Sequence, residues 1–228
     1  MIDCYSAFRA RLLTVGFSML VGSGAGAEFS ILTGGWSDAP PNPFIRWHTG
    51  DPETDPWEWR IRLLANSGEV AYAKLFFGKA GYVTREWAPR LLAVRGRGRT
   101  LEEAYSAGLV SAPAKRIYDI VGGCRGISAY QLRKRINAQG AWDASYERGL
   151  VELQMRMDIT ISGEERPEGR ARGWPASVFV SSGIFWGDDV LAEAAAIGAE
   201  DASRRIAEQI ERYYPHAKQK AAAKFIWG

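Results

Sequence analysis

Few side chains in this sequence have the types and spacing that proton transfer requires. His48 is one of two histidines, and Asp51 and Asp55 follow it within one aromatic-rich segment. An imidazole beside carboxylates can act as a general acid or base, and a nearby indole such as Trp57 can stack an extruded base. The same acids also suit turns and helix caps, and clustered tryptophans also suit a core. His48, Asp51 and Asp55 are therefore the catalytic candidates, and the catalytic residues are otherwise unknown.

The cysteine and glycine patterns give no sign of a metal or a nucleotide cofactor. Cys4 and Cys124 are the two cysteines, and the chain has no CxxC pair or Cys/His cluster. A zinc site and a disulfide framework are therefore not expected. The glycine run Gly22–Gly26 is not followed by Lys and Ser or Thr, as a phosphate-binding loop requires. We expect no metal and no cofactor.

Positive charge is concentrated in the middle of the chain. The 228 residues carry a net charge of +3, but residues 85–135 contain eleven Lys and Arg against four Asp and Glu. That segment therefore carries +7 and the rest of the chain −4. A face that binds a polyanion has this character, and so do solvated helix surfaces. With 46% hydrophobic and 24% charged residues, the composition excludes disorder, collagen and a coiled coil.

The order of elements after residue 108 is that of a winged helix-turn-helix. Ser111, Ser128 and Asp143 each begin a helix as an N-cap, and apolar residues follow them at helical spacing. A strand over 159–162, a polar segment and a returning strand over 178–180 complete the order. We predict an α+β fold with three parts: an N-terminal α/β module over 1–108, a winged-helix domain over 109–182 and a C-terminal helical cap over 183–228.

The N-terminal segment allows two interpretations. The apolar run Leu12–Val21 precedes Ala25-Gly26-Ala27 and imitates a secretory leader. The acidic Asp3 and the polar residues inside the run favour a first helix instead, with an apolar face of Phe8, Leu12, Val15 and Met19. No run reaches the roughly 18 apolar residues of a membrane span. We expect a cytoplasmic protein with no membrane partner, and we leave open whether residues 1–27 act as a leader.

The remaining segments are assigned from their caps and periodicity. Asp55 caps a helix that runs to about Asn66. The alternating run Arg95–Arg99 should form no core, because it consists of Arg and Gly; it is either a basic loop that contacts phosphates or a connector. Further strands are expected over 70–77 and 82–84, and further helices over 87–94, 190–197, 202–213 and 218–225.

The best-defined motifs lie in the expected winged helix and just upstream of it. They are Ser111–Tyr118, Ile127–Arg133, Leu150–Gly163 and an upstream block that runs from Gly50 to Gly81. In this combination the chain resembles the short bacterial members of the AlkZ-related, or YcaQ-like, winged-helix DNA-binding proteins. The resemblance covers about residues 45–228.

This resemblance implies a function on DNA but leaves catalysis uncertain. The better-studied relatives are glycosylases that remove alkylated or crosslinked bases, and a Gln-x-Gln or Gln-x-Asp pair positions their attacking water. This chain has neither pair, and its nearest string is Gln154-Met155-Arg156. Arg156 cannot act as the base, because a guanidinium stays protonated. Glycosylase activity is therefore an alternative, and a protein-interaction module on the same scaffold is another.

We expect duplex DNA as the partner, contacted by the third helix and the wing. A helix of this kind enters the major groove and the wing reaches the backbone. The outer face of the third helix is expected to carry Glu152 beside the contact residues Ser145, Arg148 and Arg156. The expected contacts from the second helix and the wing are Arg133, Lys134, Arg135, Arg166, Arg170 and Arg172. A role in DNA repair follows from the resemblance, whereas the DNA sequence or lesion and the oligomeric state stay open.

Overall fold

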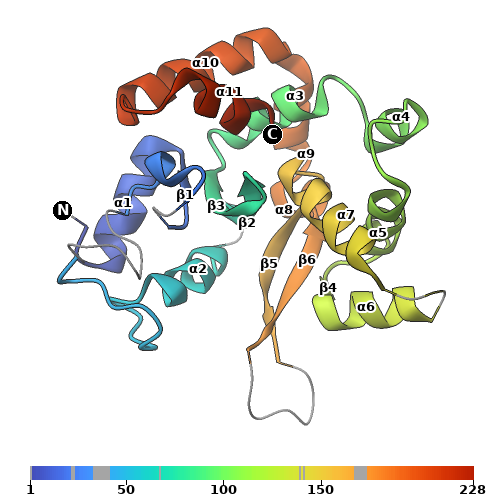
Figure 1. The fold of residues 1–228 in the computed structure, drawn as a ribbon, viewed down its shortest axis with the longest axis horizontal. Helices are drawn as coiled ribbons and strands as arrows, with labels where there is room; N and C mark the ends of the chain where they lie inside the picture. Colours follow the sequence, from blue (N-terminus) through green and yellow to red (C-terminus); the bar gives the residue numbers. More distant parts are fainter. Residues whose placement is uncertain are drawn as a thin grey trace.

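The computed structural model of this chain has a mixed α and β fold (Figure 1). It describes residues 2–21, 24–32, 42–66, 68–138, 140, 142–166 and 174–228. Its helices are α1 (Tyr5–Val15), η1 (Ala27–Phe29), α2 (Pro56–Leu64), α3 (Ala88–Gly96), α4 (Leu101–Ser106), α5 (Ala112–Gly122), α6 (Ala129–Asn137), α7 (Ala144–Met155), α8 (Ser182–Trp186), α9 (Asp188–Ala196), α10 (Ala199–Tyr213) and α11 (Gln219–Trp227). Neither η1 nor the short α8 has a counterpart among the helices that the sequence predicted.

The first helix is confirmed, but it is shorter than predicted. Phe8 and Leu12 of α1 are fully buried, as their helical spacing indicated. The helix ends at Gly16, whose φ of 92° is left-handed, and a strand follows at once. Glycine in this conformation commonly ends a helix. The prediction that Met19 continues the helical face is therefore wrong, because Met19 lies in that strand.

Six strands of the described chain form one antiparallel sheet in the order β1-β3-β2-β5-β6-β4. They are β1 (Phe17–Met19), β2 (Val70–Phe76), β3 (Lys79–Thr84), β4 (Ile127–Ser128), β5 (Ile159–Glu165) and β6 (Ala176–Ser181). Tyr72 of β2 pairs with Ile161 of β5, which joins the N-terminal strands to the β5–β6 hairpin. The sheet therefore crosses the predicted boundary at residue 108, and the division into three domains stays a prediction.

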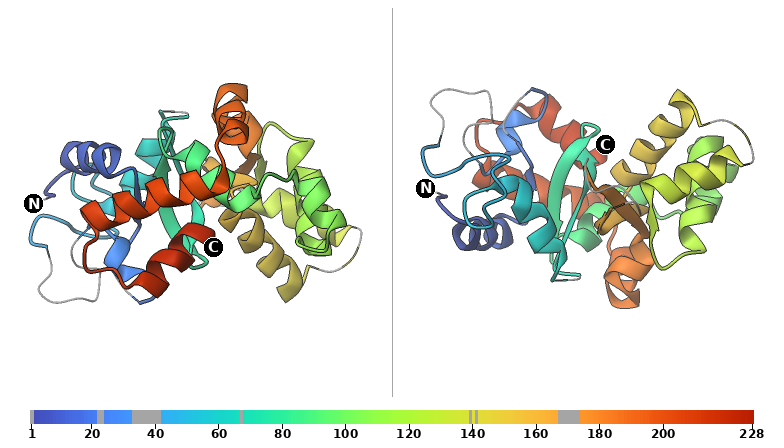
Figure 2. Two further views of the ribbon diagram at one scale, coloured as in Figure 1. Left: turned by 90° about the horizontal axis from the view of Figure 1, so that it is seen from above. Right: turned by 90° about the horizontal axis from the view of Figure 1, so that it is seen from below.

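The two faces of the sheet bury two separate groups of apolar side chains. Successive side chains of a strand point to opposite faces. Along β2, Val70 and Tyr72 belong to a group that includes α1, α2 and α5–α7, whereas Ala71, Ala73 and Leu75 belong to a group that includes α3, α10 and α11. Figures 1 and 2 show α10 and α11 over the second face. The sequence alone predicted the strand but not its burial on both sides.

The predicted helix caps are present in the structure. The side chains of Asp55, Ser111, Ser128 and Asp143 each accept a hydrogen bond from a backbone N–H in the first turn of the helix that follows. Each bond satisfies a donor that the helix itself leaves unpaired. These four residues therefore set where α2, α5, α6 and α7 begin.

Arg95 corrects the prediction that the Arg–Gly run forms no core. Arg95 lies inside α3 and is 5% exposed. Its Nη1 donates to the carbonyls of Leu75 and Met155 at 2.7 and 2.6 Å, and its Nη2 donates to that of Phe225 at 2.9 Å. Burial lowers its pKa to about 9, so the guanidinium is still charged at neutral pH. The run therefore begins in the core, and only its later residues are exposed.

Candidate nucleic-acid interface

The third helix of the expected winged helix, α7, is packed tightly against α5. At Gly149 an added Cβ would lie 2.8 Å from the backbone nitrogen of Ala114, so glycine permits this close approach. Gln154 is buried on the same helix. Its Nε2 donates to the Leu150 carbonyl and its Oε1 accepts the backbone N–H of Lys74 at 3.0 Å. The amide therefore links α7 to β2.

The outer face of α7 is smaller than the sequence predicted. Arg148 is exposed. Glu152 instead accepts hydrogen bonds from the backbone N–H and the Oγ of Ser111, at 3.0 and 2.7 Å. Arg156 donates to Asp158 at 2.7 Å, and its side chain is 17% exposed. Glu152 and Arg156 are thus already bonded within the protein, and a contact of Arg156 with DNA stays a prediction.

The other predicted DNA contacts differ in whether their side chains already bond groups of the protein itself. Ser145 donates its Oγ to Asp143 at 2.5 Å. On α6, Arg133 forms an ion pair with Glu147, and Lys134 is exposed. Arg135, also exposed, donates to the sulfur of Cys124 at 3.1 Å. The ion pair between Arg133 and Glu147 thus places the exposed cations of α6 beside the first turns of α7.

The β5–β6 hairpin carries the expected wing. Arg166 follows β5 directly and is exposed. Arg170 and Arg172 lie outside the described residues. On the returning side, Trp174 precedes β6 and is 70% exposed. An exposed indole suits contact with a partner molecule, because it combines a large flat surface with a polar N–H.

A first cavity, here called the aromatic cleft, lies between α2, α7 and the sheet. It encloses about 600 Å³. Its lining includes His48, Trp57 and Trp174, whose ring centroids lie 5.1 Å (His48 to Trp57) and 5.5 Å (Trp57 to Trp174) apart. Leu150 and Gln154 of α7 form its other wall. The size and the aromatic lining suit a planar ring.

A buried ion pair holds the aromatic cleft in shape. Arg60 and Glu164 meet at 2.9 Å, and their side chains are 5% and 16% exposed. The guanidinium carbon of Arg60 lies 3.5 Å from the ring centroid of Trp57. Arg60, like Trp57, belongs to α2, and Glu164 belongs to β5. The Arg60–Glu164 pair therefore fixes the N-terminal part of the chain against the β5–β6 hairpin. Burial raises the pKa of Tyr72 in the same wall.

The three catalytic candidates have different roles in the structure. His48 is exposed and lines the aromatic cleft. Asp55 is fully buried and accepts the backbone N–H groups of Thr49, Gly50 and Trp57. Hydrogen bonding from the backbone N–H of Glu53 lowers the pKa of Asp51, which is exposed in the same turn. Both carboxylates thus shape the turn, and His48 alone of the three candidates lines the cleft.

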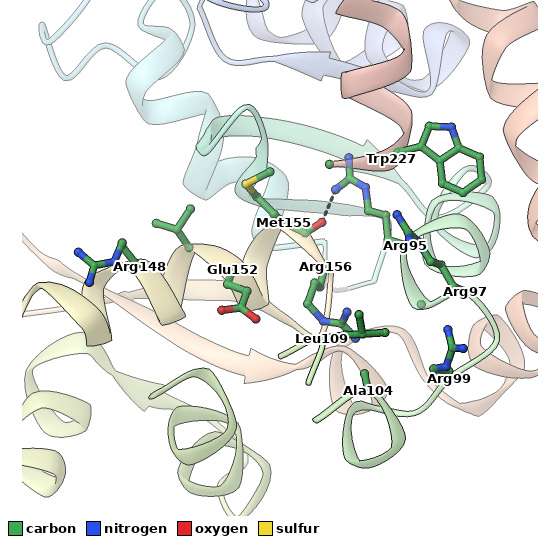
Figure 3. A pocket seen from close by; sticks show the side chains of 13 residues that line it. Arg95, Arg97, Arg99, Ala104, Leu109, Arg148, Glu152, Met155, Arg156 and Trp227 are labelled. Atoms are coloured by element: carbon green, nitrogen blue, oxygen red, sulfur yellow. Dashed lines mark hydrogen bonds between the residues drawn. The ribbon is translucent and has the colours of Figure 1, made fainter. Parts of the chain in front are cut away.

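A second cavity, here called the cationic cleft, lies on the other side of α7 (Figure 3). It also encloses about 600 Å³. Its described lining comes from α3, α7, the C-terminal end of α11 and the segment around α4, and includes Arg95, Arg97, Arg99, Leu109, Arg148, Val151, Met155, Arg156 and Trp227. Sequence reasoning identified Arg148 and the Arg–Gly run, but it had no signal that Trp227 joins them, because only tertiary packing brings the C-terminus there.

Two further features of the described residues bear on function. They contain no group of three His, Cys, Asp or Glu side chains placed to hold a metal ion. None of their helices combines the length and the apolar character that spanning a bilayer requires.

The chain folds as a mixed α/β protein. Its surface carries basic helices and two clefts, one of which is lined by cations. The chain belongs to the AlkZ-related family, whose model matches residues 2–227. The match is longer than the resemblance seen in the sequence, because it also includes α1 and β1. No curated protein and no solved structure matches the chain significantly.

Proposed function

We propose that this protein binds duplex DNA through a winged-helix unit over residues 109–182 and acts in DNA repair. The order α5–β4–α6–α7–β5–β6 supports the unit, because the short β4 pairs with β6 and β6 pairs with β5. A winged helix has this pairing, with a strand between its first two helices added to the wing hairpin. The observation that carries the proposal is this pairing in a chain of the AlkZ-related family.

In this proposal, the first turns of α7 enter the major groove. Recognition helices contact base edges mainly through their N-terminal residues. Arg148 is the exposed cation of these turns, and a guanidinium can contact a guanine or a phosphate in two places at once. Ser145 lies one turn earlier. Arg156 contributes less, since its guanidinium is paired with Asp158.

The flanking cations of the proposed interface bind the DNA backbone. On α6, Lys134 and Arg135 are exposed, and Arg133 shares its charge with Glu147. Arg166 follows β5, and Arg170 and Arg172 belong to the same hairpin segment of the sequence. Contacts of this kind position a protein on DNA without reading its sequence.

Fluorescence anisotropy of a labelled duplex tests the proposal. We expect affinity to fall with salt, with a slope of about −0.9 per phosphate contact in a plot of log K against log salt. Replacing both Arg148 and Arg170 with Ala should weaken binding by about tenfold or more and make this slope shallower. His48→Ala, in the aromatic cleft, should bind as the wild type does.

Three results would contradict this assignment. The first is a duplex affinity no greater than that of a neutral control protein, which would favour the protein-interaction alternative. The second is an equal loss for the His48 variant and the double arginine variant. The third is an affinity that does not change with salt. Lys220→Ala serves as the matched charge control, because Lys220 is exposed on α11 and outside both clefts.

The aromatic cleft favours a second candidate, a glycosylase acting on a base extruded from the duplex. An extruded base is held by stacking between aromatic side chains, and Trp57, Trp174 and His48 surround a space of suitable size. The Gln-x-Gln and Gln-x-Asp pairs of the relatives are absent from the sequence. Glycosylase activity is tested by incubating the protein with alkylated or crosslinked duplex and then cleaving the DNA at abasic sites. Strand breaks above background would support this activity, and their absence would reject it.

A further inference from the structure

The cationic cleft combines two kinds of surface that the duplex-binding proposal does not use. Arg97 and Arg99, at and just after the C-terminal end of α3, form one side (Figure 3). Met155 and Leu109 lie between them and Arg148, and form an apolar floor. A ligand that contacts both surfaces would combine negative charge with an apolar body.

The charge of the cleft is positive even when its acids are counted. Arg97 and Arg99 are exposed. Glu152 is the one acidic side chain among the described residues that line the cleft, and Ser111 already binds its carboxylate. Glu103 lies near Arg99, but it is the capping residue of α4 and accepts the Thr100 N–H.

Arg95 makes the cationic side of the cleft rigid. Its guanidinium bonds the carbonyls of Met155 and Phe225, and so ties α3 to the ends of α7 and α11. The exposed Trp227 of α11 is thereby held beside α3, with the guanidinium carbon of Arg97 5.7 Å from its ring centroid. A site whose groups are fixed before binding loses less entropy when the ligand arrives.

The apolar floor is partly exposed within the cationic cleft. Leu109 is 52% exposed and Trp227 39% exposed, and both face the same cavity as Val151 and Met155. Thioether and indole groups make favourable contacts with flat rings. Free phosphate or sulfate would leave this floor uncovered.

We propose that the cationic cleft binds one phosphorylated nucleoside, with the phosphate on Arg97 and Arg99 and the base on the floor of Leu109, Met155 and Trp227. Guanidinium groups bind phosphate through paired hydrogen bonds. A volume of about 600 Å³ lies within the range of small-ligand sites. The ligand is either a free nucleotide or the phosphorylated end of a DNA strand, since both present the same chemistry. The site borders the duplex surface proposed above at Arg148, but it places the phosphate on Arg97 and Arg99, which that surface does not use.

Isothermal titration calorimetry of the full chain tests this site with four probes. They are thymidine 5′-monophosphate, a short single-stranded oligonucleotide with a 5′-phosphate, the same oligonucleotide without it, and inorganic phosphate. We expect saturable binding of the nucleotide or of the phosphorylated strand, at least about tenfold tighter than that of inorganic phosphate or of the unphosphorylated strand. Preference for the free nucleotide or for the strand identifies the source of the ligand.

Three variants assign the binding to the cleft. Arg99→Ala and Arg97→Gly should each weaken binding by about tenfold; glycine is used at position 97 because Arg97 has a left-handed φ of 51°. Arg99→Lys should give an intermediate loss, since it keeps the charge but not the paired donors. Lys220→Ala, on the same helix as Trp227, is the matched control and should bind normally. Melting temperatures close to that of the wild type establish that each variant is folded.

Several outcomes would overturn the proposal. They are the absence of saturable binding by both phosphorylated probes, equal affinity for nucleotide and inorganic phosphate, and affinity unchanged by the Arg97 and Arg99 variants. Duplex binding is measured separately by anisotropy with the Arg97 and Arg99 variants, which leave Arg148 unchanged. Loss of the nucleotide site with normal duplex binding, or the reverse, therefore separates a failure of this inference from a failure of the proposed function.

Discussion

At the scale of single residues, many polar side chains with apparent chemical potential are engaged in holding the backbone. Asp55 accepts a backbone N–H from Trp57 in the first turn of α2 and two more from the turn before it. Asp143 caps α7, and Glu152 binds Ser111, the N-cap of α5. These carboxylates already bond groups of the protein itself. The chemistry of this protein is therefore more readily found in the exposed arginines and aromatic rings than in its acids.

The capping role of Asp143 makes the stability of the protein depend on pH. Hydrogen bonds from the Ser145 side chain and backbone lower the pKa of Asp143 below its ordinary 3.8. A group whose pKa is lowered by folding stabilises the folded state above its unfolded pKa and loses that contribution as the pH falls through the lowered value. We expect the wild type to lose more thermal stability between about pH 5 and about pH 3 than Asp143→Asn, because asparagine also caps a helix but does not titrate.

Circular dichroism melts of the two proteins across this pH range measure the effect. Other carboxylates titrate in both proteins, so the difference between the two melting temperatures isolates Asp143. At neutral pH the two proteins should melt at similar temperatures. A difference that stays constant from neutral to acidic pH would show that the charge of Asp143 does not stabilise α7.

The sequence predicts these local features well and buried charges poorly. Ser111, Ser128 and Asp143 cap helices as expected, because a cap depends only on residues within the next turn. Arg95 and Arg156 were expected to be exposed. The Phe225 carbonyl reaches Arg95 only after α11 has packed against α3, so no local pattern could have indicated that Arg95 is enclosed. Asp158 lies two residues after Arg156, so that ion pair is local, and only the burial of the pair depends on tertiary packing.

At the scale of elements, α7 is the wall between the two clefts. Leu150 and Gln154 face the aromatic cleft, whereas Val151 and Met155 face the cationic cleft. Gly149 faces α5. The spacing of these residues follows the helical period, so rotating or shifting α7 would change both cavities together. The sequence predicted the helix and its inner face, but it could not predict the clefts, because their opposite walls come from α2, α3 and α11.

The contact at Gly149 gives a direct test of this packing. Gly149→Ala would place a Cβ 2.8 Å from the backbone nitrogen of Ala114, so α7 must move away from α5. We expect the free energy of unfolding to fall by about 1–3 kcal/mol, measured by urea denaturation. Gly122→Ala is the matched control, because an added Cβ at Gly122 meets nothing within 4 Å. It should be neutral or stabilise the protein by up to about 1 kcal/mol. Equal effects of the two substitutions would contradict the close contact.

At the scale of the whole molecule, the parts that the sequence separated are joined by the sheet and by buried polar links. The pair Tyr72–Ile161 continues the sheet from β2 into β5, and Arg60–Glu164 joins α2 to the same strand. Cap residues and hydrophobic periodicity identify elements one at a time. They do not indicate that a strand before residue 108 pairs with one after it, because strand pairing depends on contacts distant in sequence. The family match over residues 2–227 agrees with this continuity.

Substitution of Arg95 should weaken the packing of α3 against β2, α7 and α11. Arg95 donates to carbonyls of β2, of the C-terminal end of α7 and of α11, at Leu75, Met155 and Phe225. Arg95→Met keeps much of the volume but leaves these buried carbonyls without their donor, and each unsatisfied group costs about 1–3 kcal/mol. We expect the free energy of unfolding to fall by about 3 kcal/mol or more. Lys220→Met, on the exposed face of α11, should change it little.

Hydrogen exchange distinguishes a local loss at Arg95 from a loss of the whole fold. Because two of the carbonyls belong to the ends of α7 and α11, exchange in Arg95→Met should rise most over residues 219–227 and at the end of α7. The Trp227 side of the cationic cleft would then lose its support, and nucleotide binding should weaken even under conditions in which the variant is folded. A urea midpoint and an exchange pattern identical to those of the wild type would show that α11 is held by apolar packing alone, through Phe225 and Ile226.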